Sequence, residues 1–167
     1  MATVPKTFWA SEAHFLSSSF PQLKKISGTN FPVPGLYYDA SAAENAFWYF
    51  VANNYGSGNL TLRIYWYADT ASSGDVIWGA QIAAITPNTD TQDVETKSFA
   101  TANTATDSHL GTTGQREHSV DITISNLDSL AADDYVCLKI YRDAAAGGDT
   151  MTGDAILVAA LLTYSDT

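Results

Sequence analysis

Side chains suited to metal binding are thinly spread along this sequence. No two of the three histidines stand at metal-ligand spacing, and none stands at that spacing from the single cysteine. These residues are His14, His109, His118 and Cys137. Glu117 and His118 are adjacent, so their side chains would point to opposite faces of a strand. The sequence therefore predicts surface or interface histidines rather than a zinc site.

Nucleophile and phosphate-binding signatures are also missing. The sequence has no Gly-x-Ser-x-Gly elbow, and Cys137 falls within an expected strand, away from any helix end that would lower its pKa. The glycines near residues 57 and 148 lie in loops with no helix after them, so no motif cradles phosphate. We therefore expect an inert thiol at Cys137 and a chain that is not an enzyme and carries no cofactor.

Aspartates bracket two loops, which opens two further kinds of chemistry. One loop carries Asp143, Asp149 and Asp154, and the other carries Asp69 and Asp75. Their oxygens could bind calcium, although the spacing does not match the calcium-loop motif and aspartate also caps turns by itself. Glycosidase chemistry needs two carboxylates about 5–10 Å apart in a cleft, and nothing in the sequence fixes such a pair. Turn capping is the simpler interpretation, and calcium binding stays open.

The stretch LRIYWYAD, residues 62–69, turns a tyrosine pair and an arginine outward. Its leucine, isoleucine and tryptophan alternate with Arg63, Tyr65 and Tyr67. Outward aromatics of this kind pack across strands, join subunits or stack on sugar rings. These three alternatives stay open. The candidates for a subunit interface are Arg63, Tyr65 and Tyr67 together with Tyr141, which lies on another expected outer face.

Composition narrows the classes of partner. The formal net charge is −10, from 18 acidic and 8 basic residues, and Lys24-Lys25 is the only adjacent basic pair. Nucleic-acid binding is therefore not expected, because it draws on clustered lysine and arginine. No apolar stretch reaches the ~18 residues of a membrane-spanning helix. The start lacks the order of a secretion signal, so we expect a protein made in a cytoplasm.

The elements expected to position these side chains are strands. Alternating or densely apolar runs of strand length, separated by turn residues, predict an all-β fold. Their number favours an antiparallel β-sandwich, an eight-stranded jelly roll over residues 36–167, because two packed sheets manage their edges without disulfides. The expected strands are 36–39, 45–53, 60–68, 76–85, 94–100, 117–125, 135–142 and 155–164.

Residues 1–35 differ from this pattern. They hold four of the five prolines together with scattered aromatic residues, and proline is poor strand or helix material. We expect an extended N-terminal arm that lies either on its own domain or on a neighbour. Its candidate contact residues are Phe8, Trp9, Phe15 and Phe20. Residues 86–115 are the other irregular region, and loops of that length are usually functional or packed on a partner.

Three runs carry a resemblance to a known group of proteins. They are LRIYWYADTASSGDVIWGAQIAAITPNTDTQD, HLGTTGQREHSVDITISNLDSLAADDYVCLKIYRDAA and DTMTGDAILVAALLTYSDT. Together they resemble small, uncharacterised virion structural proteins of tailed bacteriophages, with jelly-roll-like domains. The resemblance covers most of residues 36–167 and lies in the general run of the sequence. It includes no catalytic motif, so it carries no active-site residues.

The resemblance implies a role in the virion. It implies a cement or decoration protein that binds the capsid exterior as a homotrimer, with the major capsid protein as partner, after synthesis in the host bacterial cytoplasm. Neither nucleic acid nor membrane is an expected partner. The alternative is a tail or fibre domain that binds host surface glycans. Head or tail location, oligomer number and host are left open.

Overall fold

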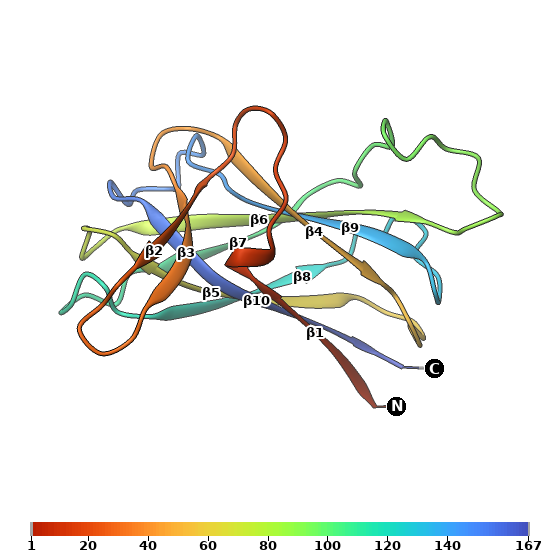
Figure 1. Ribbon diagram of the computed structural model, residues 1–167, viewed down its shortest axis with the longest axis horizontal. Coiled ribbons are helices and arrows are strands. Elements are labelled where there is room, and N and C mark those ends of the chain that lie inside the picture. Colours follow the sequence, from red (N-terminus) through yellow and green to blue (C-terminus); the bar gives the residue numbers. More distant parts are fainter. Residues whose placement is uncertain (1, 167) are drawn as a thin grey trace.

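The alternation of apolar and polar side chains becomes ten strands in the computed structural model, which describes residues 2–166 (Figure 1). In β5 (Leu60–Ala68), Leu62, Ile64 and Trp66 are fully buried, and the residues between them face outward. The other strands are β1 (Thr3–Trp9), β2 (Gln22–Ile26), β3 (Val33–Tyr38), β4 (Glu44–Val51), β6 (Asp75–Ile85), β7 (Asn103–Ser108), β8 (His118–Ile124), β9 (Tyr135–Arg142) and β10 (Ala155–Ser165). A short 3-10 helix, η1 (Ala10–Glu12), follows β1.

The strands pair as a nested set. β3 pairs with β10, β4 with β9, β5 with β8 and β6 with β7, all antiparallel. Further pairing makes two sheets: sheet A, in the order β2-β3-β10-β5-β8 with β1 also on β10, and sheet B, in the order β4-β9-β6-β7. Rolling four nested pairs into two packed sheets produces the jelly roll. The predicted antiparallel β-sandwich is therefore confirmed.

The core lies between the two sheets and is built around aromatic side chains. Trp66 of sheet A lies 6.2 Å from Trp78 of sheet B, measured between ring centroids. Tyr38 meets the same Trp78 ring edge-on at 5.2 Å, and its hydroxyl donates a hydrogen bond of 3.0 Å to the carbonyl of Ile140. Buried aromatic side chains contribute large apolar areas, so this cluster stabilises the sandwich without a disulfide.

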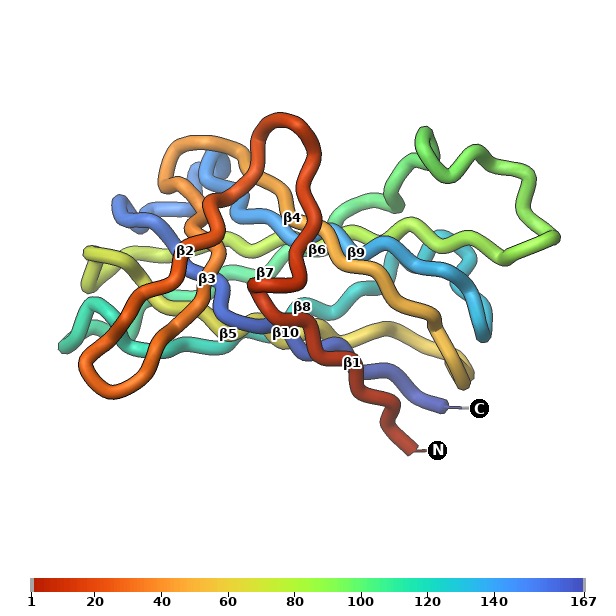
Figure 2. Tube along the Cα trace, in the orientation of Figure 1, coloured from red at the N-terminus to blue at the C-terminus, as the bar shows by residue number. Residues whose placement is uncertain are grey.

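The N-terminal segment differs from the expected arm, because two of its stretches are strands of sheet A. β1 pairs with the second half of β10, from Thr3 opposite Ser165 to Trp9 opposite Ala159. β3 covers the first half of β10, and β2 continues the sheet beyond it. Because β1 is paired on one side only, it tolerates Pro5, as edge strands do. The start of β1 and the end of β10 consequently lie side by side (Figure 2).

One predicted strand is misplaced. Residues 94–100 are not a strand, and the strand that follows β6 in the chain and pairs with it is β7, which begins at Asn103. The phenylalanine that suggested the earlier strand, Phe99, packs instead on Phe47 of β4, with ring centroids 5.9 Å apart. The loop between β6 and β7 therefore folds back over the outer face of sheet B.

Candidate functional site

A groove of about 650 Å³ lies on the outer face of sheet B, and we call it the sheet-B groove. Its floor is formed by outward side chains of β4, β9 and β6. One wall comes from residues 14–16 and the other from residues 94–99. In Figure 1 these walls are the red loop after β1 and the green loop after β6. The floor residues are Phe47, Tyr49, Ala83, Tyr135, Cys137 and Lys139.

Strand alternation places the aromatic floor. In β4, Ala46, Trp48 and Phe50 enter the core, so Phe47 and Tyr49 must face outward. Both faces of this stretch carry apolar residues, a sequence pattern typical of a central strand or of a strand with one face at an interface. The outward face is the groove floor.

Backbone hydrogen bonds fix the first wall. His14 and Phe47 form an isolated bridge, in which the N–H of each donates to the carbonyl of the other at 2.8 and 3.0 Å. The N–H of Asn45 donates to the carbonyl of Ser19 at 2.8 Å. The loop after η1 is therefore tied along β4 rather than left free.

The second wall is tied to β6 and to the loop after β8. The side-chain amide of Gln81 donates to the carbonyl of Ala100 at 2.7 Å, and the N–H of Ala100 donates to the carbonyl of Ile82 at 2.9 Å. The Lys97 ammonium lies 2.9 Å from a carboxylate oxygen of Asp128. Both walls are thus held at several points, so the groove is preformed.

Three rings form a row along the groove. The His14 ring centroid lies 5.2 Å from that of Tyr49, and Tyr135 follows at 5.8 Å with its ring only 7° from parallel to Tyr49. Tyr49 is 46% exposed and Tyr135 is 42% exposed, high values for aromatic side chains. Partial burial, and then the nearby Cys137, raise the pKa of both tyrosines, so their hydroxyls are neutral donors and acceptors at pH 7.

A second group of side chains surrounds Lys139. Its ammonium lies 5.0 Å from the ring centroid of Phe99 and 5.6 Å from that of Tyr141. Tyr141 lies across Gly79, where an added Cβ would come within 2.2 Å of the tyrosine ring. Burial lowers the pKa of Lys139 and raises that of the neighbouring Cys137 to about 11. The Cys137 thiol is therefore neutral at pH 7, as an inert thiol should be.

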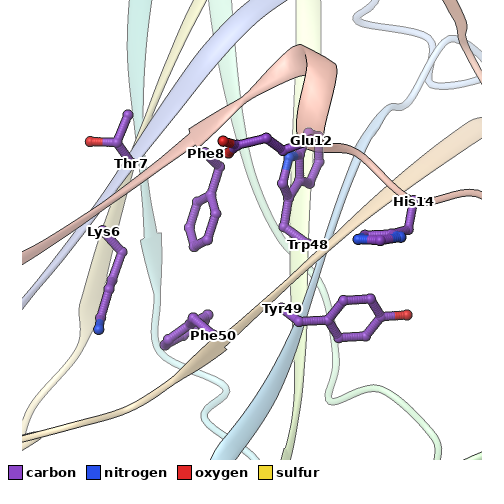
Figure 3. Close-up of a pocket in the computed structure, with 8 residues that line it drawn as sticks. All are labelled: Lys6, Thr7, Phe8, Glu12, His14, Trp48, Tyr49 and Phe50. Carbon is purple, nitrogen blue, oxygen red and sulfur yellow. The ribbon is translucent and has the colours of Figure 1, made fainter.

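A smaller pocket of about 340 Å³ adjoins the groove and shares His14 and Tyr49 with it. Figure 3 shows the Phe8 ring directed toward Phe50, with His14 beside Tyr49. The Phe8 centroid lies 5.8 Å from that of Phe50 and 6.4 Å from that of Trp48. Phe8 is only 6% exposed, so it belongs to the core and cannot be the partner contact that we expected.

The other three arm candidates remain exposed. Trp9 is half exposed, and its carbonyl accepts a hydrogen bond of 3.0 Å from the indole N–H of Trp48. Phe15 and Phe20 pack against each other with centroids 5.5 Å apart, and Phe15 also lines the groove. These residues are therefore divided between the groove wall and the free surface.

The four interface candidates do not lie together. Arg63, Tyr65 and Tyr67 face outward from β5 in sheet A, whereas Tyr141 belongs to sheet B. Arg63 forms a two-point ion pair with Asp121, its direct neighbour on β8, at 2.7 and 2.8 Å. For Arg63, this contact is the cross-strand pairing that was one of the three alternatives.

One of the loop aspartates, Asp149, forms an ion pair within the fold. Asp149 is buried against Arg142, with an oxygen–nitrogen distance of 2.6 Å. Across residues 2–166, no three histidine, cysteine or carboxylate side chains gather as a potential metal site. Sequence reasoning did not identify the partner of Asp149, because seven positions separate it from Arg142 and only the folded loop brings them together.

Two of the histidines are buried rather than exposed as predicted. His118 stacks on Trp66 at 4.6 Å, and His109 lies 4.6 Å from His118 between ring centroids. Nε2 of His118 accepts a hydrogen bond of 3.0 Å from the N–H of Leu110, and Nδ1 of His109 accepts one of 3.0 Å from that of Gly111. Each ring therefore holds the 109–117 loop only while that nitrogen is unprotonated.

Acid is expected to destabilise this loop through His118. Burial, and then the neighbouring His109, lower the pKa of His118 below its usual 6.5, against an opposing effect of Asp107. Between the pKa of His118 in the folded chain and its higher value in the unfolded chain, the unfolded chain binds more protons than the folded chain. Stability is therefore lost as the pH falls below about 6.5. Thermal melts between pH 8 and 5 should show a falling Tm, with a smaller fall in His118→Gln, whose amide oxygen can accept the same N–H. A His14→Gln control should follow the wild type; equal slopes in all three proteins would contradict this assignment.

Three solved structures are similar to this chain over most of its length. A family 11 carbohydrate-binding module of a Clostridium thermocellum cellulosomal cellulase is 8% identical, covers 97% of this chain and 87% of that chain, and has a TM-score of 0.48. TmCBM27, a carbohydrate-binding module described for specific mannan recognition, is 10% identical over 99% of both chains, with a TM-score of 0.47. CBM28, a module specific for non-crystalline cellulose, is 12% identical, covers 93% of this chain and 84% of that chain, and scores 0.46.

These similarities indicate neither a family nor a ligand for this chain, because all three scores are below 0.5. No protein-family model matches the sequence, and no curated protein matches it. Within residues 2–166, no helix is both long and apolar enough to span a membrane.

Proposed function

We propose that this chain is a non-catalytic carbohydrate-binding domain whose sheet-B groove holds a glycan. The observation that carries the proposal is the row of three rings in a preformed groove, with Tyr49 and Tyr135 on the floor and His14 on the first wall. Ligand sites are typically concave, largely apolar and supplied with a few polar groups. The sheet-B groove has each of these properties.

The chemistry of the lining suits a sugar. A pyranose ring has C–H faces that lie against aromatic rings and hydroxyls that point outward from its edge. Tyr49 and Tyr135 offer apolar ring bodies with neutral hydroxyls at their tips. Asn45 and His14 add polar atoms along the first wall. Together these groups can stack a sugar and hydrogen-bond its hydroxyls.

The groove is better suited to binding than to hydrolysis. Glycoside hydrolysis typically uses two carboxylates that flank the bond to be cleaved. Among the described residues that line the groove, Glu95 supplies the one carboxylate, and it lies on an exposed wall. The floor itself supplies rings, a thiol and an ammonium group.

Binding of the intact chain to soluble polysaccharides tests the proposal. Native affinity electrophoresis should show retardation by at least one member of a panel that includes mannan, xylan, mixed-linkage glucan, polygalacturonate, alginate and hyaluronan. Calorimetry with oligosaccharides of the retarding polymer should then give a 1:1 complex. Unchanged mobility in every gel would contradict the proposed function.

A second candidate function is assembly on a virion surface, which we infer from the phage-protein resemblance and one structural observation. Large apolar side chains are unusually exposed between residues 9 and 31, and exposed apolar patches mark interaction sites. Phe31 reaches 70% exposure. The occupant would be further copies of the chain and the outer capsid surface. The exposed residues are Trp9, Phe15, Leu16, Phe20, Leu23, Ile26 and Phe31.

Point substitutions test assembly better than removal of the segment, because β1 and Phe8 are part of the sandwich. Light scattering should find a homo-oligomer, expected to be a trimer, that Leu23→Ser combined with Phe31→Ser weakens at least about tenfold in Kd, as loss of buried apolar contacts requires. Leu110→Ser, which replaces an exposed leucine in the loop after β7, is the control. A monomeric wild-type chain at every concentration would exclude self-assembly.

A further inference from the structure

Resting on the proposed function, we propose that the glycan held in the sheet-B groove is acidic and that Lys139 pairs with its carboxylate. The ligand class would then be a polysaccharide containing uronic acids or similar carboxylated sugars. Four observations carry this proposal: the position of Lys139, its lack of a counter-ion, the neutrality of its neighbours and its burial.

Lys139 lies in the middle of the groove floor. On β9 it stands directly opposite Phe47 of β4 on one side and Gln81 of β6 on the other. It is therefore on the central strand of the three that form the floor. Cys137 stands directly opposite Tyr49, so Lys139 lies one outward residue along β9 from Tyr49, on the side away from Tyr135. A ligand that rests on the Tyr49 ring and extends along the floor in that direction reaches the ammonium group.

The Lys139 ammonium has no protein counter-ion among residues 2–166. The ion pairs in this part of the chain join Arg63 to Asp121, Lys97 to Asp128 and Arg142 to Asp149. Lys97, the other ammonium in the groove, is thus already neutralised, with Asp128 at 2.9 Å. Lys139 is left as the uncompensated positive charge of the floor.

The groups around Lys139 do not supply negative charge at pH 7. Cys137 has a pKa of about 11, and burial raises the pKa of Tyr141 above its usual value. The Gln81 amide is engaged with the carbonyl of Ala100. Phe99 and Tyr141 offer ring faces, which attract a cation more weakly than a desolvated carboxylate does.

A carboxylate on the ligand would neutralise the unpaired positive charge of Lys139. Partial burial of an unpaired ammonium is unfavourable, and the cation–ring contacts offset only part of that loss. A charge-assisted hydrogen bond inside a half-enclosed groove is shorter and stronger than a neutral one. The net charge of −10 opposes the approach of a polyanion. Selectivity for acid must therefore come from direct contact at Lys139 and not from the overall field of the protein.

The test compares each acidic polymer with its own carboxyl-reduced form. Polygalacturonate, alginate and hyaluronan are titrated beside their reduced counterparts, against wild-type protein, Lys139→Gln, Lys139→Arg and the control Lys25→Gln, which removes an exposed lysine of β2 in sheet A. We expect wild type to bind at least one acidic polymer about tenfold more tightly than its reduced form. Lys139→Gln should lose that preference while keeping its affinity for the reduced form, and Lys139→Arg should restore it. Thermal melts confirm that each variant is folded.

Each outcome separates this inference from the proposed function. Equal affinity for acidic and reduced polymers, binding of neutral polysaccharides alone, or an acid preference that survives in Lys139→Gln would overturn the role of Lys139. The groove would still be a carbohydrate site in each of these cases. If no polysaccharide binds at all, the proposed function fails and this inference fails with it.

Discussion

Replacing Asp149 with alanine is expected to lower the free energy of unfolding by about 3–5 kcal/mol, because it leaves a buried charge without its partner. Nε and Nη2 of Arg142 donate to the two carboxylate oxygens of Asp149 at 3.0 and 2.6 Å. The two side chains are 0% and 1% exposed. In Asp149→Ala the Arg142 guanidinium remains a buried charge, because arginine is not deprotonated in proteins.

The same ion pair closes one end of the sandwich. Arg142 also donates to the backbone carbonyls of Gly153, at 2.8 Å, and Met151. Asp149 accepts a further hydrogen bond of 3.0 Å from the N–H of Ile77 in β6. The pair therefore holds the 143–154 loop against β6 and β9. Urea unfolding followed by tryptophan fluorescence measures the loss, with the slope of the transition as a check on two-state behaviour.

The chain carries its own matched control on the surface. Arg63 and Asp121 form an ion pair of the same two-point geometry, at 2.7 and 2.8 Å, but their side chains are 47% and 43% exposed. Asp121→Ala should barely move the urea midpoint, because water and side-chain entropy cancel most of an exposed pair's attraction. If Asp121→Ala and Asp149→Ala shifted the midpoint equally, burial would not be the reason for the effect. The double variant Arg142→Met, Asp149→Leu should recover part of the loss, because it removes both charges but leaves the carbonyls of Gly153 and Met151 and the N–H of Ile77 without these partners.

The alternation of apolar and polar residues alone explains most of the strands of the sandwich. The exceptions depend on contacts between separate parts of the sequence, which alternation does not contain. Tyr135–Arg142 puts Arg142 on the core side with Ile140, a position that period-2 reasoning reserves for apolar residues. Arg142 can be buried there only because the 143–154 loop places Asp149 against it. Likewise, proline content indicated an arm for residues 1–35, whereas pairing to β10 is a long-range property that makes β1 a strand.

The sequence predicted only part of the candidate site. The two-faced apolar run that became β4 did indicate an unusual outer face, and the length of the loop after β6 indicated function or partner contact. Yet Tyr65 and Tyr49 have the same alternation and the same residue type. Tyr49 lines a groove because the loops after β1 and β6 fold over sheet B, and those contacts depend on tertiary structure that no local pattern contains.

Removing the ring of Tyr49 is expected to weaken glycan binding by about 2 kcal/mol, roughly 30-fold in Kd, the size typical of a tyrosine at the centre of a binding surface. The reason is its central place in the ring row, between His14 at 5.2 Å and Tyr135 at 5.8 Å. Tyr135→Ala should have a similar effect, because it removes the other near-parallel ring. Calorimetry with an oligosaccharide of the polymer that retards the wild type measures both changes.

Two matched variants separate stacking on the Tyr49 ring from hydrogen bonding by its hydroxyl and from binding on sheet A. Tyr49→Phe keeps the ring and removes only the hydroxyl, so it should retain most of the affinity if the ring face makes the contact. Tyr65→Ala removes a partly exposed tyrosine from the outer face of sheet A and should leave Kd unchanged. Because Tyr49 is half exposed, Tyr49→Ala should stay folded, which its Tm checks. A loss of binding in Tyr65→Ala with Tyr49→Ala unaffected would move the site to sheet A, where Tyr65 and Tyr67 would be the sugar platform.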